Sequence, residues 1–271
     1  MKKLLVCVFT GAMSQLCGLQ VTPWLGNWLE FEGSLYQKHT ESKKVDTTHG
    51  TKHEYLHSEK SVCSLEFMPL EDLSTELEFA AAKTQRKGYG FEALKAQVRY
   101  NLLNDLVGDP VTLTTGLATS ISTPSRIRDL SSTEHAVFES DARVACGREF
   151  GYSDNGFYKA WAMGLMGVGS SGSGWVAGEV HVERELYDRH HFDLFLTFEK
   201  GLSSHKLHHI DDFHSYSRLG YEFEEVGFKY TLKEIALGSL YLQYAKRLHA
   251  RYCPRASWSV EVGFLIPFSP W

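Results

Sequence analysis

The chain has 271 residues, of which 43% are hydrophobic and 23% are charged. This length suits one large domain or two ordinary ones. Its 28 Lys and Arg residues are outnumbered by 33 Asp and Glu residues, which leaves a net charge of −5. Because this balance provides no basic surface large enough to bind nucleic-acid phosphates, we expect no nucleic-acid partner.

The N-terminal residues predict an export signal. Residues 1–3 (Met-Lys-Lys) are positively charged and residues 4–9 are apolar, which is the pattern of a secretory signal peptide. The cleavage site is weakly marked, and we place it near Gly18, with lipidation of Cys17 as the alternative. The expected organisation is a signal peptide over residues 1–18 and one domain over residues 19–271.

Three widely spaced cysteines follow this segment: Cys63, Cys146 and Cys253. In an exported chain, an odd number of cysteines argues against a disulfide framework. No later segment offers the roughly 18 consecutive apolar residues of a transmembrane helix. An exported chain of this kind is periplasmic, secreted or a membrane β-barrel.

Alternation of apolar and polar residues decides among these three classes. In the clearest run, the apolar positions are Leu94, Ala96, Val98, Tyr100 and Leu102. A period of two predicts a β-strand. The runs cover about 10 to 14 residues, more than the usual strand of about 5 or 6, and this length suits tilted strands that cross a bilayer. In chain order the alternation recurs within residues 29–35, 63–67, 75–79, 94–102, 136–145, 176–183, 192–198, 215–230 and 258–268.

The connections between these runs alternate in length. Longer polar connections are expected at residues 39–53, 85–90, 123–133, 201–213 and 249–255. Tighter turns are expected between them at residues 69–72, 104–110, 151–156, 187–190 and 231–234, and the short segment 169–174 is an exception on the long side. Long loops on one side and short turns on the other are typical of outer-membrane barrels.

One irregularity affects the strand count. Within residues 215–230, the apolar parity shifts from the series Leu219, Tyr221, Phe223 to the series Val226, Phe228, Tyr230. A one-residue bulge at Glu224 and Glu225 would explain the shift and give twelve strands, whereas a hairpin would give thirteen. Because single-chain bacterial barrels have even strand numbers, we expect an all-β fold, a transmembrane antiparallel up-and-down β-barrel of about 12 strands.

The charged rows indicate which face is inside. A Lys or Arg side chain facing lipid near the midplane costs about 2 to 4 kcal/mol, so we expect the apolar rows to face lipid. A soluble sandwich or closed barrel, with the apolar rows in a core, is the alternative. The predicted lumen-lining residues are Lys95, Gln97, Arg99, Glu139, Asp141, Arg143, Glu179, His181, Glu183 and Asp193.

The last run has a wholly apolar face, formed by Trp258, Val260, Val262, Phe264, Ile266 and Phe268. In this ending the chain resembles Gram-negative outer-membrane β-barrel proteins, whose final strand carries alternating apolar residues and a terminal aromatic. The resemblance implies an outer-membrane location, contact with outer-membrane lipids, and recognition of this strand by the barrel-assembly machinery. It departs from the pattern in that Trp271, out of parity, follows Phe268.

A looser resemblance involves the segments KAQVRYNLLND, TTGLATSISTPSR and ARVACGREFGY, which lie within residues 95–152. In the order of their strands and turns they are similar to the channel family associated with the meta-cleavage pathway of phenol degradation. This resemblance covers about a quarter of the chain and implies a channel function.

Barrel width predicts a narrow pore. About 8 strands leave an interior filled by side chains and about 16 leave an open channel, so twelve strands would give a narrow lumen of mixed charge. We therefore expect a porin-like channel for small solutes, although the same residues could be ion pairs that only hold the lumen together. A structural or host-facing surface protein, supported by the longer loops, is a further alternative.

An outer-membrane lipid hydrolase is the enzyme alternative, because some twelve-stranded barrels carry the motif His-x-Ser-Asn-Gly. The nearest strings here are LHSEKS at residues 56–61 and YSDNG at residues 152–156. Neither reproduces the spacing of a nucleophile and its base on a lipid-facing strand. We therefore expect no catalytic residues.

A polar segment gathers side chains that bind metals: His205, His208, His209, Asp211, Asp212 and His214. Imidazole and carboxylate groups can hold a transition metal, but their spacing here is irregular, so we interpret the segment as a solvated loop. No phosphate-binding loop, Cys-x-x-Cys pair or dinucleotide motif occurs. We expect no metal site and no cofactor.

Overall fold

The computed structural model describes residues 22–153, 156–170, 172–235 and 238–269. The long strands are β1 (Phe31–Thr47), β2 (Gly50–Leu70), β3 (Leu73–Thr84), β4 (Gly90–Leu103), β5 (Thr112–Ser122), β6 (Phe138–Ser153), β7 (Gly156–Gly169), β8 (Trp175–Leu186), β9 (His190–Gly201), β10 (Glu222–Ile235), β11 (Gly238–Arg251) and β13 (Trp258–Phe268). The connections contain η1 (Asp105–Val107), η2 (Ile210–Asp212), η3 (Tyr216–Arg218) and the two-residue strand β12 (Pro254–Arg255). Among these residues, no helix has both the length and the apolar character needed to span a bilayer.

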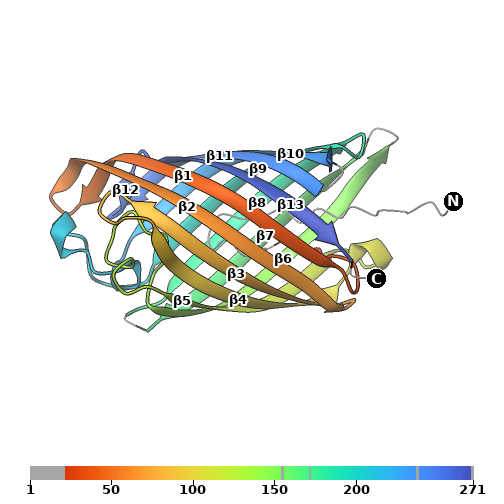
Figure 1. The fold of residues 1–271 in the computed structure, drawn as a ribbon, viewed down its shortest axis with the longest axis horizontal. Coiled ribbons are helices and arrows are strands. Elements are labelled where there is room, and N and C mark those ends of the chain that lie inside the picture. The colour runs from red at the N-terminus through yellow and green to blue at the C-terminus, as the bar shows by residue number, and fades with distance from the viewer. Residues whose placement is uncertain (1–21, 154–155, 171, 236–237, 270–271) are drawn as a thin grey trace.

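These strands form one antiparallel sheet that closes into a barrel (Figure 1). Closure is made by β1, which pairs with β2 on one side and with β13 on the other. Because β12 only bridges to β1 at Lys44 and Val45, the wall has twelve strands. This confirms the predicted fold. The predicted signal peptide over residues 1–18 lies outside the described residues.

The apolar rows of the strands cover the outside of the barrel. Leu94, Val98 and Leu196 are 47%, 48% and 54% exposed, whereas Lys95 and Arg99 are 4% and 3% exposed. Side chains alternate between the two faces of a strand, so the same period that exposes the apolar residues buries the charged ones. An apolar belt of this extent is stable against lipid and not against water. The soluble alternative is therefore wrong.

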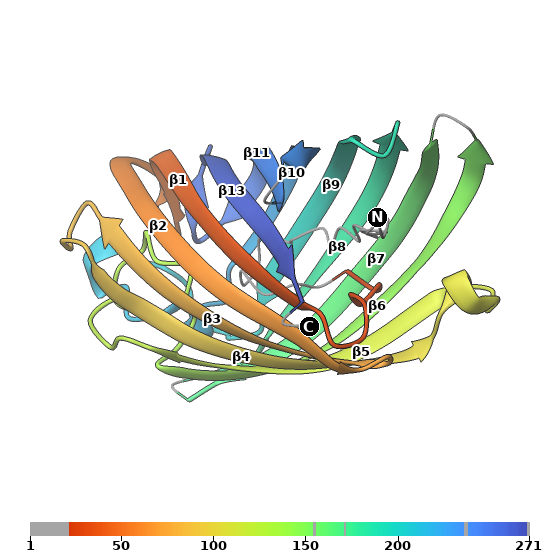
Figure 2. The same ribbon diagram turned by 45° about the vertical axis from the view of Figure 1, so that its right-hand side comes forward.

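The two ends of the barrel differ in their connections (Figure 2). One end, called here the turn end, holds the start of β1, the end of β13, and the connections 71–72, 104–111 and 187–189. The opposite end, called here the loop end, holds residues 85–89, 123–137, 202–221 and 252–257. The predicted turn at residues 231–234 is wrong, because β10 continues to Ile235 before β11 begins at Gly238.

The predicted loop at residues 39–53 is also wrong. β1 and β2 stay paired from Phe31 and Phe67 as far as Thr47 and Gly50, and only residues 48 and 49 form the turn. The hairpin therefore extends the barrel wall at the loop end (Figure 1). Polar residues hid these strands from the apolar pattern, although backbone hydrogen bonds between strands do not require apolar side chains.

The parity shift in residues 215–230 has a different cause from the one predicted. The pairing of β10 with β11 does shift between Glu224 and Glu225, but the extra residue is Leu248 on β11. Tyr221 faces inward because it packs in an apolar cluster of the loops, and Phe223 packs against that cluster. The count of twelve strands is correct, while the bulge lies on the neighbouring strand.

Candidate functional site: the charged lumen

All ten predicted lumen residues are buried, at 1% to 9% exposure. They lie on β4, β6, β8 and β9, at positions that alternate with exposed apolar residues. Three of them contact one another: the Arg143 guanidinium donates to Gln97 Oε1 at 2.8 Å and to Asp141 Oδ2 at 3.0 Å. The inner face of these strands therefore carries buried charged side chains, some of which contact one another.

At the turn end, the segment before β1 enters the barrel. Arg99 Nη1 donates to the carbonyl oxygen of Thr22 at 2.9 Å, and the Thr114 hydroxyl donates to the carbonyl of Pro23. The same Arg99 guanidinium forms an ion pair with Glu66. These contacts use inward-facing side chains of β2, β4 and β5, so the N-terminal segment lies inside the lumen.

Trp24 is the anchor of this segment. Its indole Nε1 donates to Asp105 Oδ1 at 3.0 Å, and the Lys159 ammonium lies 4.5 Å from its ring centroid. Gly147 makes room for it, since a Cβ there would lie 2.8 Å from both Trp24 Cη2 and Pro23 Cγ. Trp24 also belongs to an apolar cluster with Trp161 and other inward residues of β6, β7 and β8. We call residues 22–29 the N-terminal plug.

At the loop end, residues 123–137 turn into the barrel, and we call them the inserted loop. Glu134 Oε1 lies 3.1 Å from Lys60 Nζ and 3.0 Å from Lys95 Nζ. Burial raises the pKa of the Glu134 carboxyl, but attraction to Lys95 and Lys60 outweighs it and holds that pKa well below its usual range. The Thr84 hydroxyl donates to Asp129 Oδ2 at 2.5 Å, which fixes the middle of the loop.

His135 makes the second ionic contact of the inserted loop. Its Nε2 lies 2.7 Å from Glu199 Oε1, and its Nδ1 lies 3.4 Å from Glu139 Oε2. The ring stacks on Trp175 with centroids 4.2 Å apart. Burial lowers the pKa of His135, but Glu199 and Glu139 outweigh it and raise that pKa to about 10, so the imidazole is a cation at neutral pH.

Residues 202–221 cover the inserted loop with an apolar cluster. The Tyr216 hydroxyl donates to the carbonyl oxygen of Leu130 at 2.8 Å. Below this cluster lies a cavity of about 100 Å³, whose wall includes Lys38, His135 and Arg247. Figure 2 shows both loops gathered at the loop end. The cluster consists of Val45, Leu56, Leu130, Leu207, Phe213, Tyr216, Leu219, Tyr221, Ala250, Tyr252 and Cys253.

The strand pattern in the sequence did not reveal the inserted loop or the N-terminal plug. Glu134 and His135 lie in a polar stretch that no strand pattern contains, and Trp24 precedes the first strand. Lys60, which contacts Glu134, lies in the polar part of β2. A tryptophan outside any strand was the available signal for the plug, because a large aromatic side chain gains most from burial.

The histidine-rich segment, residues 205–214, packs against the β1–β2 hairpin. His208 Nδ1 lies 2.9 Å from Thr48 Oγ1, and His209 Nδ1 lies 3.4 Å from Lys52 Nζ. The string at residues 56–61 lies in β2, where His57 and Ser58 point to opposite faces. These two neighbours therefore cannot act as base and nucleophile on one substrate.

No protein-family model matches the chain, and no curated protein matches its sequence. Solved structures share its fold. An outer membrane channel from Pseudomonas putida F1 has a TM-score of 0.63 and 12% sequence identity, over 90% of this chain and 97% of that chain. A NanC porin and a KdgM porin have TM-scores of 0.54 and 0.50, with 8% and 10% identity, over 86% and 87% of this chain and 98% and 99% of theirs.

Identities this low establish the fold alone. The closed wall, its apolar outer belt and its charged interior agree with that fold. In a membrane barrel, charged side chains that line the inside avoid lipid. The outer faces of the long strands therefore suit lipid, and their inner faces suit a polar lumen. The chain is therefore a twelve-stranded outer-membrane β-barrel.

Proposed function

We propose that this barrel is a channel that passes small solutes through a narrow lumen of mixed charge. The observation that carries the proposal is the buried, charged interior wall, to which β4, β6, β8 and β9 contribute. Replacing buried ion pairs by apolar side chains is often neutral or stabilising. Retaining them along the lumen is therefore better explained by passage of polar solutes than by stability.

Two segments of the chain enter the lumen in this conformation. The N-terminal plug enters the turn end and is anchored there by Trp24, and the inserted loop crosses the loop end through Glu134 and His135. Solutes would pass when one or both of these segments move. We therefore propose a channel whose conductance is limited by its own plug and loop.

Three finer assignments belong to this proposal. We place the chain in the channel family associated with the meta-cleavage pathway of phenol degradation, on the likeness of residues 95–152. Two of the fold neighbours bear the names outer membrane channel and NanC porin, which supports a channel function. We also propose that residues 1–18 are removed on export and that β13 is the strand read by the barrel-assembly machinery.

Single-channel recording in a planar bilayer tests the proposal. The wild-type barrel should give small conductance steps above those of a protein-free bilayer. Trp24→Ala removes the anchor of the plug, and a buried Trp→Ala change costs about 3 to 5 kcal/mol, so this variant should conduct more. The matched control is Trp28→Ala, since Trp28 is 57% exposed.

Two results would contradict the channel. The first is the absence of conductance from both the wild type and Trp24→Ala, when a shift of gel mobility on heating shows that both proteins are folded. The second is release of fatty acid from phospholipid by the refolded protein, which the hydrolase alternative predicts and the channel does not. Equal conductance of the wild type and Trp24→Ala would disprove the role of Trp24 in holding the plug and leave the channel intact.

A further inference from the structure

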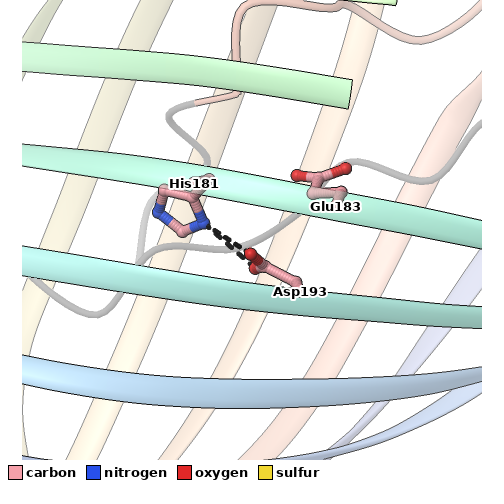
Figure 3. Close-up of side chains that lie close together, drawn as sticks. All are labelled: His181, Glu183 and Asp193. Atoms are coloured by element: carbon pink, nitrogen blue, oxygen red, sulfur yellow. Dashed lines mark hydrogen bonds and ion pairs between the residues drawn. The ribbon is translucent and has the colours of Figure 1, made fainter. Parts of the chain in front are cut away.

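A group of possible metal ligands lies on two neighbouring strands of the lumen wall. His181 and Glu183 of β8 and Asp193 of β9 each bring a ligand atom within 4.8 Å of the other two (Figure 3). Glu183 and Asp193 are cross-strand partners, and His181 is two residues from Glu183, so all three side chains share the inner face. We propose that this group is a binding site for a divalent transition-metal ion, with Zn²⁺ as the probe.

The three side chains offer one nitrogen and two carboxylates. Both carboxylate oxygens of Asp193 lie 3.0 Å from His181 Nδ1, as the dashed lines in Figure 3 mark. An ion that replaced the proton between them would bind this nitrogen, Asp193 and Glu183, which is a donor set that Zn²⁺ accepts. Ligands of a tetrahedral Zn²⁺ site lie about 3.4 Å apart, so a small side-chain rotation would complete the site.

Neighbouring groups already orient these ligands. Glu179 Oε2 lies 3.3 Å from His181 Nε2, so Nδ1 is the nitrogen left for an ion. Metal-binding histidines commonly donate their other N–H to a carboxylate in this way, which fixes the ring. Trp161 stacks on the His181 ring, with centroids 3.8 Å apart, and Phe195 lies on the ring as well at 5.3 Å. The imidazole therefore has one position.

The Glu183 carboxylate is held in the same manner. Trp161 Nε1 donates to Glu183 Oε1 at 2.5 Å, and His191 Nε2 lies 3.0 Å from Glu183 Oε2. Both donors come from strands that flank β8. A ligand set carried by rigid strands and supported by a second layer of hydrogen bonds is preorganised for a metal.

Charge favours a divalent cation here. Glu179, Glu183 and Asp193 carry three negative charges within this part of the wall, and all are 1% to 2% exposed. Two lysines lie near it on the inner face: Lys229, in register with Asp193, and Lys159, in register with Glu183 and paired with Glu149. The Lys229 ammonium lies 4.3 Å from the Tyr241 ring centroid. With Lys159 paired to Glu149, the three carboxylates outnumber the one remaining lysine, and a divalent ion would balance them.

Titration of the detergent-solubilised full barrel with Zn²⁺ by calorimetry tests the site. The wild type should bind one ion tightly, and Asp193→Asn should weaken that binding at least tenfold. This substitution removes a charge but keeps an oxygen that can accept from His181, so the barrel should still fold. The matched control is the double variant His208→Gln/His209→Gln, whose affinity should change less than twofold, because these residues lie in the exposed histidine-rich segment.

A second measurement reports directly on the position of the ion. Co²⁺ bound to His181 would lie beside the indole of Trp161 and quench its fluorescence, and Trp161→Phe should abolish that part of the quenching. Equal Zn²⁺ affinity of the wild type and Asp193→Asn would overturn the proposal, as would loss of binding only in the His208→Gln/His209→Gln variant. Because no solute passage is measured, failure here leaves the proposed channel untouched.

Discussion

Glu134→Gln should release the inserted loop from the lumen wall. The Glu134 carboxylate contacts Lys60 and Lys95 at 3.1 and 3.0 Å, and both lysines are buried. The substitution keeps the shape of the side chain and one acceptor oxygen. It removes a real charge, since attraction to the two lysines outweighs burial and keeps the pKa of Glu134 well below neutral.

The size of the effect follows from these distances. At an effective dielectric constant of 20, unit charges 3 Å apart attract by about 5.5 kcal/mol, and desolvation offsets much of that gain. Removing one partner of a buried ion pair costs about 3 to 5 kcal/mol. Because the introduced amide would still accept a hydrogen bond, we take about 3 kcal/mol, which shifts the balance between docked and released loop by about a hundredfold.

Two assays measure this shift. In planar bilayers the Glu134→Gln channel should be open for a larger fraction of the time and more selective for anions, since Lys60 and Lys95 lose their countercharge. Trypsin should cleave the loop faster after Arg126, which is 5% exposed in the docked loop. The matched control, Asp211→Asn, removes one negative charge from the exposed part of residues 202–221.

If folded Glu134→Gln behaves like the control in both assays, Glu134 does not hold the inserted loop in the lumen. A faster trypsin cut without a change in conductance would have a narrower meaning. It would show that Glu134 docks the loop but that the loop does not limit passage.

Two further predictions concern pH and the lipid face. His135 has a folded pKa of about 10 because Glu199 and Glu139 outweigh its burial; its stabilisation is full below about pH 6.5 and is lost as pH rises through 10. The open fraction of the channel should therefore rise between about pH 8.5 and 10.5, and His135→Gln should lack this step. Leu196→Lys on the outer face should lower the free energy of unfolding in lipid by about 2 to 4 kcal/mol. Leu202→Lys, at similar exposure in a loop, should change it by under about 0.5 kcal/mol, and equal effects of the two would contradict the lipid-facing belt.

Much of the barrel wall could be predicted because one physical rule governs the strands that face lipid. In a strand that separates lipid from a polar lumen, each side chain faces one or the other, so the period of two records the environment directly. Lys95 and Leu94 are neighbours with 4% and 47% exposure. The pattern therefore predicted the barrel fold without any knowledge of which strands pair.

The N-terminal plug and the inserted loop, which enter the lumen, could not be predicted from the alternation of apolar and polar residues. Glu134 reaches Lys60 across 74 residues of sequence, and Trp24 reaches Asp105 across 81. Such contacts depend on which strands face each other across the barrel, and alternation within one strand contains no information about that. The polar part of the β1–β2 hairpin was predicted as a loop for a different reason: its backbone pairing continues where the lipid-facing pattern has ended.

The parity shift near Phe223 arises where the barrel wall meets a segment that enters the lumen. Tyr221 faces inward, and its side chain is surrounded by neither lipid nor water but by the apolar cluster that includes Leu130 and Tyr216. At this position, an apolar residue on the inner face marks where a loop packs inside the barrel. Trp24 and Trp161 mark the corresponding place at the turn end, and the wall also carries charged side chains and a further apolar cluster that includes Tyr36 and Tyr241. In the proposed channel, the two apolar ends would control access, and the charged middle would select among the solutes that enter.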